Sequence, residues 1–181
     1  QVQDAQTMVQ RLKDIEARQS SSQLRLLIQA FQASLALQTD CFDQAIELSE
    51  ALLPQLKPEK DQYLIIVTSY VLGVAQTHQG QFRAAKDAFL RVRQTSQTEN
   101  HTWLHLNAIR LLAYLCVQQW RLHAAHEYYQ EGLQLIDTAT SGGKPVLADL
   151  MYSGLCEIAY EWNDLDKAET YLDKAFALAH M

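Results

Sequence analysis

Two pairs of histidines stand at spacings that place side chains on one face of a helix. His101 and His105 are four residues apart, and His123 and His126 are three apart. Imidazole is a common metal ligand, but a structural metal site of this kind needs further ligands. We find no cysteine or carboxylate that completes either pair. The sequence therefore predicts no metal site and no cofactor, and we expect these histidines to be solvated or hydrogen-bonded near turns.

Catalytic motifs are also missing from the sequence. There is no glycine-rich phosphate loop, no nucleophile elbow, and no carboxylate pair at a position forced into an apolar site. The acidic residues of DQAIELSE and DKAETYLDK fall on polar helix faces, where solvation and helical charge pairing account for them. We therefore expect no enzymatic activity.

The composition is that of a folded protein, with 48% hydrophobic and 20% charged residues in a chain of 181. The net charge is -6, and phosphate binding needs a cluster of Lys and Arg that we do not find. No stretch approaches the roughly 18 consecutive apolar residues of a membrane span. We expect neither direct binding to nucleic acid nor insertion into a membrane.

Three cysteines lie far apart in apolar, helix-like stretches: Cys41, Cys116 and Cys156. An odd number without regular spacing is not typical of a disulfide framework. We expect three buried, reduced thiols and a cytoplasmic location.

The chain repeats itself at a period of about 40 residues. The segments FDQAIELSEAL, FRAAKDAFLRV, LHAAHEYYQEG and LDKAETYLDKA each place an alanine three residues after a large apolar residue. These anchor alanines are 40, 40 and 43 residues apart, and three of them are followed four residues later by a large side chain, whereas the first is followed by Ser49. The anchors are Ala45, Ala85, Ala125 and Ala168, and the followers are Phe89, Tyr129 and Leu172. Counting back another 40 residues reaches Ala5, which is preceded by Val2 in the same relation.

A second helical run precedes each anchor segment, with a small residue 12 positions before the anchor alanine: Ala33, Gly73, Ala113 and Cys156. The run YLIIV, residues 63–67, is ambiguous alone because aromatic and β-branched residues favour strands. The equivalent positions of the other units form long amphipathic helices, so the register predicts a helix here too. Each unit is thus an antiparallel helical hairpin.

Turn residues separate the predicted helices. Asp40, Gly80 and Asn163 fall inside the hairpins, and the stretches LLPQLKPEK and TSGGKP join one hairpin to the next. The longer last period is explained by Ser141, Gly142 and Gly143 in the second of these loops.

These features resemble the tetratricopeptide repeat: a small residue in the first helix, a Gly or Asp turn, an anchor alanine and a following aromatic residue. The units exceed the standard length of about 34 residues, and the usual Trp and Pro are mostly missing. Such long units are similar to the sensor region of MalT-like, large ATP-binding regulators of the LuxR family. The resemblance implies an all-α fold, a right-handed superhelix of stacked hairpins in one domain, residues 1–181. Its parts are the second helix of a truncated repeat (1–18) and four repeats (23–57, 60–97, 100–138 and 145–181) of a larger protein.

Stacked hairpins present their first helices on a concave face. We expect one stripe of these helices to face the neighbouring unit: Leu72, Gly73, Ile109, Leu112, Ala113, Cys116, Tyr152, Leu155, Cys156 and Ala159. The adjacent stripe would line a groove, and Trp103 would add a stacking platform. These groove residues are Tyr70, Val74, His78, Trp103, Arg110, Tyr114, Gln118, Ser153, Glu157 and Tyr160. The alternative is that the aromatic residues among them pack against neighbouring helices.

Two functions fit such a groove. In the first, the chain is the effector-sensing segment of a bacterial transcriptional regulator, in which a small molecule binds the groove or a hairpin junction and changes the superhelix. In the second, it is a scaffold that binds an extended peptide or partner helix. A chaperone-type clamp for a terminal carboxylate is not expected, since the groove offers Arg110 and, more remotely, Asn107.

The first predicted hairpin lacks its first helix, which would leave Val2, Met8, Val9 and Leu12 partly uncovered. We therefore expect a homodimer or end-to-end packing through exposed end repeats. His180 and Met181 are compatible with either a native end or a cloning remnant.

Overall fold

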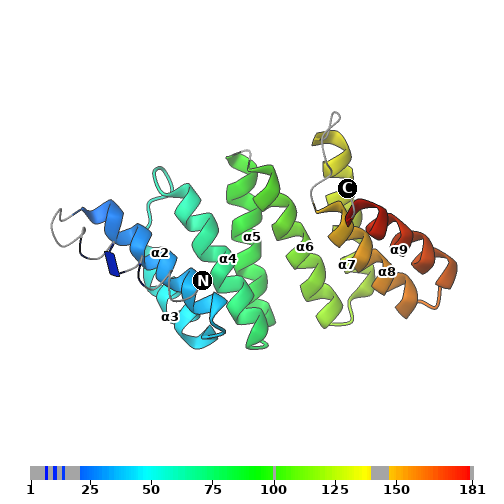
Figure 1. Cartoon of the computed structure of the whole chain (residues 1–181), viewed down its shortest axis with the longest axis horizontal. Helices are drawn as coiled ribbons and strands as arrows, with labels where there is room; N and C mark the ends of the chain where they lie inside the picture. The colour runs from blue at the N-terminus through cyan, green and yellow to red at the C-terminus, as the bar shows by residue number, and fades with distance from the viewer. Residues whose placement is uncertain are drawn as a thin grey trace. The chain divides into compact units, whose positions relative to one another are not determined.

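The computed structural model describes residues 21–99, 101–139 and 147–179, together with Thr7, Gln10, Arg11 and Asp14 (Figure 1). Val2, Met8, Val9, Leu12, the loop residues Ser141, Gly142 and Gly143, and His180 and Met181 lie outside the described residues. Throughout the described ranges the regular elements are helices, which confirms the all-α prediction.

The chain forms two compact units, Gln1–Glu99 and Asn100–Met181. The helices of the first unit are α2 (Ser22–Gln38), α3 (Phe42–Leu52), the short 3-10 helix η1 (Leu53–Gln55), α4 (Gln62–His78) and α5 (Phe82–Thr98). Helix α2 packs on α3 and α4 packs on α5, so each pair is a hairpin, and α4 also contacts both α2 and α3 (Figure 1). Helix α4 contains the YLIIV run, so the helix predicted there is confirmed.

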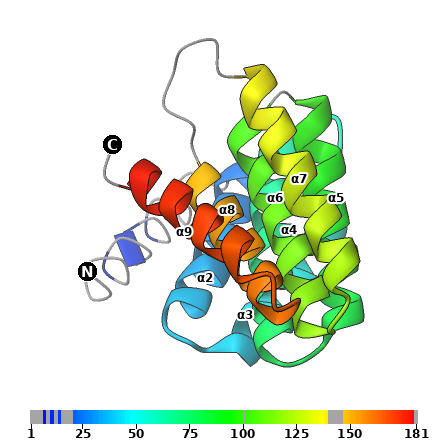
Figure 2. The same ribbon diagram turned by 90° about the vertical axis from the view of Figure 1, so that its right-hand side faces the viewer.

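The second unit contains α6 (Thr102–Gln118), α7 (Leu122–Ala139), α8 (Ala148–Glu161) and α9 (Leu165–Ala179). Helix α6 pairs with α7. Helix α8 pairs with α9, and these two helices lie side by side in Figure 2. Helix α8 also contacts α6 and α7, which stacks one hairpin on the other within this unit.

Each hairpin turns through the same arrangement of backbone hydrogen bonds. The amide of Cys41 donates to the carbonyl of Ala36 at 2.9 Å, and equivalent bonds join Gln81 to Gln76, Arg121 to Cys116 and Asp164 to Ala159. The residue before each donor has a positive φ: Asp40 (57°), Gly80 (71°), Trp120 (56°) and Asn163 (58°). This left-handed residue closes the helix by satisfying its last carbonyls. The predicted turns at Asp40, Gly80 and Asn163 are confirmed, and Trp120 is a fourth that the sequence analysis did not identify.

The anchor alanines lie at the centre of the packing. Ala45, Ala85 and Ala125 are 0% exposed and Ala168 is 8% exposed. A methyl side chain lets two helix backbones approach closely, so a larger residue would separate them. Of the positions expected to face a neighbouring helix, Leu72, Gly73, Ile109, Leu112, Ala113, Cys116, Leu155 and Ala159 are buried, while Tyr152 and Cys156 are half-buried.

The prediction of three buried thiols is wrong for Cys41. All three cysteines are free, but Cys41 is exposed, Cys116 is buried and Cys156 is half-buried. Cys41 directly follows the turn residue Asp40 and precedes α3, and its Sγ lies 3.6 Å from the carbonyl oxygen of Thr39. The turn directs this side chain outward, although the flanking residues are apolar.

Candidate functional site

The predicted groove residues lie on the first helices of the hairpins, and we call them the first-helix surface. In the first unit these residues are Tyr70, Val74 and His78 of α4. Tyr70 is half-buried and packs against the cluster around Ala45 and Ala75. His78 is exposed, and its ring stacks on Phe42 with centroids 4.4 Å apart and an interplanar angle of 6°. In the first unit, side chains of the first-helix surface therefore pack against other residues of the same unit.

In the second unit the first-helix surface begins on α6. Trp103 is 51% exposed at the start of the helix, Tyr114 is 40% exposed, and Gln118 is exposed at the end. Arg110 is half-buried, and its Nε and Nη2 donate to the Asn107 Oδ1 at 3.1 and 2.9 Å. Because Asn107 is 4% exposed, these two hydrogen bonds tie the guanidinium to a buried side chain and hold it in one orientation.

Helix α8 contributes the acidic and the most exposed aromatic groups of the same surface. Glu157 is exposed and Tyr160 is 66% exposed. The hydroxyl of Ser153 donates to the carbonyl of Asp149, four residues earlier in the same helix, at 2.9 Å. Helices α6 and α8 therefore present rings, one cation and one anion on this surface.

Tyr129 of α7 packs against α8, and the sequence analysis identified it only as the large residue that follows the anchor Ala125. Its side chain is 4% exposed and passes over Gly154 of α8, where an added Cβ would lie 2.5 Å from the phenol oxygen. Burial and, to a smaller extent, the charge of Glu157 raise the pKa of Tyr129 to about 12, against an opposing effect of Arg110. The phenol thus remains protonated and close to both charged groups. The glycine in α8 was the sequence signal for this close approach.

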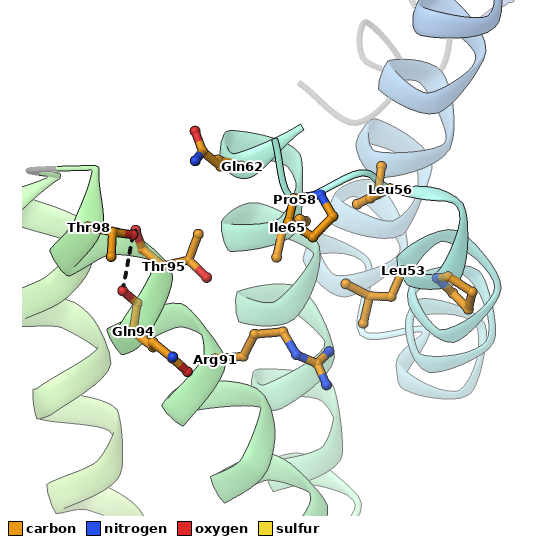
Figure 3. A pocket seen from close by; sticks show the side chains of 10 residues that line it. Leu53, Leu56, Pro58, Gln62, Ile65, Arg91, Gln94, Thr95 and Thr98 are labelled. Atoms are coloured by element: carbon orange, nitrogen blue, oxygen red, sulfur yellow. Dashed lines mark hydrogen bonds between the residues drawn. The ribbon is translucent and has the colours of Figure 1, made fainter. Parts of the chain in front are cut away.

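A pocket of about 600 Å³ lies in the first unit, where one hairpin connects to the next (Figure 3). We call it the hairpin-junction pocket. One wall is the connecting segment with η1 and the start of α4: Leu53, Pro54, Leu56, Pro58, Gln62 and Ile65. The other wall is the last part of α5: Arg91, Gln94, Thr95 and Thr98. The sequence analysis identified this segment as a connection and named none of these residues as site residues.

The histidine pair of α7 packs against an aromatic ring. His123 and His126 lie with ring centroids 4.9 and 5.5 Å from Trp162. Burial lowers the pKa of His126, and the neighbouring His123 lowers it further. Within the described ranges, no group of three or more His, Cys, Asp or Glu side chains could hold a metal ion.

Comparisons with known proteins give one family and one fold. The family model of the MalT-like TPR region matches residues 27–181. No curated protein sequence matches the chain. Among solved structures, the crystal structure of BtubC (BKLC) from P. vanneervenii is similar, with a TM-score of 0.74 and 18% identity over 98% of this chain and 72% of that one. At this identity the likeness shows the fold alone, which is an α-solenoid of helical repeats.

Proposed function

The chain belongs to the MalT-like TPR family, and on that premise we propose that it senses an effector for a bacterial transcriptional regulator in the cytoplasm. The coarser conclusion, a helical-repeat domain for sensing or interaction, follows from the family itself. Members of such repeat families bind partners on their helical surfaces and are generally not catalysts. No described helix is long and apolar enough to cross a membrane.

The observation that best supports an effector site is the arrangement around Tyr129 in the second unit. Its buried, protonated phenol feels the charges of Arg110 and Glu157, and the exposed ring of Tyr114 belongs to the first-helix surface. A cation, an anion and an aromatic face suit a polar ligand with a flat apolar side, such as a sugar or a small metabolite.

An effector bound here would contact two hairpins at once, because Arg110 and Tyr114 lie on α6 whereas Glu157 and Tyr160 lie on α8. Those helices pack on each other within the second unit. A ligand that fits one spacing of α6 and α8 better than another would favour that state by its difference in affinity. Such a change in the stack is the signal that we propose the rest of a regulator would receive.

A protein scaffold is the second candidate function. It is favoured by large apolar side chains that remain exposed on the same helices, namely Trp103, Tyr114 and Tyr160. An extended peptide or partner helix would cover such rings and gain binding energy from their burial.

The coding sequence on both sides of this chain distinguishes the two functions. The regulator proposal predicts an upstream nucleotide-binding module with a G-x-x-x-x-G-K-[ST] loop and a downstream helix-turn-helix. Flanking sequence that encodes further repeats and neither module would contradict the regulator proposal and leave the scaffold.

A further inference from the structure

We propose that the hairpin-junction pocket binds a small amphipathic anion, with a carboxylate at one end and a short apolar chain at the other. This inference goes beyond the proposed function, because the pocket is separate from the first-helix surface and its ligand class follows from its own walls. All of its lining residues belong to the first unit.

The junction wall of the pocket is apolar and held in place. Its apolar side chains include Pro54. The others are Leu53, Leu56, Pro58 and Ile65 (Figure 3). Two prolines fix backbone dihedrals in this wall, so little entropy is lost when a ligand orders it. An apolar chain of a ligand would lie against this wall.

A buried carboxylate fastens the same segment to the rest of the unit. The Oδ2 of Asp61 accepts from the amide of Lys57 at 2.9 Å, and its Oδ1 accepts from Nε2 of Gln23 at 3.0 Å. The first of these bonds lowers the pKa of Asp61, and the second lowers it further. Asp61 is 5% exposed and does not line the pocket. Its carboxylate therefore stabilises the connecting segment and does not contact a ligand. The pocket is thus formed before a ligand arrives.

The α5 wall is polar and positively charged. Arg91, Gln94, Thr95 and Thr98 are spaced three and four residues apart, which places them on one helical face. The side chain of Arg91 extends from α5 toward the junction in Figure 3. A guanidinium at the edge of an apolar pocket suits a carboxylate, which it binds through two parallel hydrogen bonds.

The surrounding charge favours an anion as well. Helix α5 contains Arg83, Lys86, Arg91 and Arg93 against a single acid, Asp87, in a chain whose net charge is -6. The junction is neutral by comparison, with Lys57 and Lys60 against Glu59 and Asp61. Helix α5 is therefore locally basic in an acidic protein, and it would attract a negatively charged ligand.

The size of the pocket limits the ligand to a small molecule. A volume of about 600 Å³ lies within the roughly 300–1,000 Å³ range of pockets for small ligands. A ligand bound in the pocket would contact the junction, α4 and α5 together, and would stiffen the connection between two hairpins.

Octanoate is the probe that tests this assignment, with octanol as its uncharged counterpart, titrated into the 181-residue chain by calorimetry. We expect octanoate affinity to fall about tenfold or more in Arg91→Gln, as loss of a charge-assisted contact predicts. Lys86→Gln is the matched control, because Lys86 is an exposed cation of the same helix that does not line the pocket. Octanol should bind both variants alike.

The location of binding gives a second readout. Amide resonances of Ile65, Thr95 and Thr98 should shift on titration, and Ile65→Asp, which places a carboxylate on the apolar wall, should weaken octanoate further. Tyr114→Ala should leave octanoate binding unchanged, so failure of this proposal is separable from failure of the first-helix site. Equal octanoate affinity in Arg91→Gln and Lys86→Gln, no binding at millimolar octanoate, or shifts confined to the second unit would each overturn the proposal.

Discussion

Phe89 of α5 and Tyr129 of α7 occupy the same position of the repeat, four residues after the anchors Ala85 and Ala125, but they pack on different glycines. Phe89 lies against Gly73 in the first helix of its own hairpin, where an added Cβ would be 2.5 Å from its ring. Tyr129 lies against Gly154, which belongs to the first helix of the next hairpin. One repeat position therefore closes a hairpin in the first unit and joins two hairpins in the second.

Phe89 in the first unit and Tyr129 in the second also differ in chemistry. Phe89 is 0% exposed and brings no polar atom to its contact. Tyr129 is almost as deeply buried, yet its hydroxyl lies near the charges of Arg110 and Glu157. A repeat can thus keep its packing pattern while one unit acquires a polar group beside the surface that we propose binds an effector.

Phe89→Ala should have the largest effect on stability. Removing a fully buried phenyl ring costs about 3–5 kcal/mol of unfolding free energy, measured by urea denaturation. Leu172→Ala is the matched control, because Leu172 occupies the same repeat position but is 44% exposed; it should change the free energy by less than about 1 kcal/mol. Equal losses in the two variants would contradict the difference in burial between these two positions.

Alkaline pH should destabilise the second unit through Tyr129. Its pKa is raised from 10.0 to about 12, so the unfolded state ionises first and stability is lost between these values. Below pH 10 the contribution is complete, and by pH 12 about 2–3 kcal/mol should be gone. Unfolding curves of the wild type and Tyr129→Phe across this range measure the loss, which should be missing in the variant. Parallel curves would show that the phenol is not buried.

Alanine at either glycine should destabilise by overpacking. We expect Gly73→Ala and Gly154→Ala each to cost about 1–3 kcal/mol, reduced by the better helix propensity of alanine. Double-mutant cycles with Phe89→Leu and Tyr129→Leu sharpen the comparison. Gly73 should couple to position 89 and Gly154 to position 129, whereas coupling in the crossed pairs would contradict the two packing partners.

The smallest expected effect concerns the turn at Trp120. An aromatic residue in the left-handed region is strained by about 1–2 kcal/mol, part of which glycine would recover. Trp120→Gly should therefore raise the unfolding free energy by about 0.5–1 kcal/mol, and Asn163→Gly should change it less, since asparagine tolerates this conformation. A destabilised Trp120→Gly would mean that the indole, 75% exposed, makes a stabilising contact.

The sequence predicted the hairpins well because their signals are local and periodic. Anchor alanines, turn residues at Asp40, Gly80 and Asn163, and the helical register across YLIIV all follow from spacing along the chain. Trp120 was missed because its type does not indicate a turn, and its conformation is imposed by hydrogen bonds of the repeat. Cys41 was assigned to the core because the apolar character of its neighbours does not reveal the direction of a side chain at a turn.

The sites were less predictable because they depend on contacts between helices. Register placed Arg110 and Tyr114 on one face, but it could not reveal that Asn107 holds the guanidinium or that Tyr129 reaches across from α7. The hairpin-junction pocket brings Leu53 and Arg91 together across almost forty residues of sequence, and no motif marks either wall. Such sites arise from how helices pack, which spacing within one helix does not specify.

The most direct test of the effector proposal is a paired thermal-shift screen of sugars, small metabolites and short peptides. The wild-type chain is compared with Arg110→Gln/Tyr114→Ala, with Tyr63→Ala, an exposed tyrosine outside the proposed surface, as control. We predict compounds that stabilise the wild type and Tyr63→Ala but not the double variant. Compounds that stabilise all three proteins equally would show that the first-helix surface of the second unit is not the effector site.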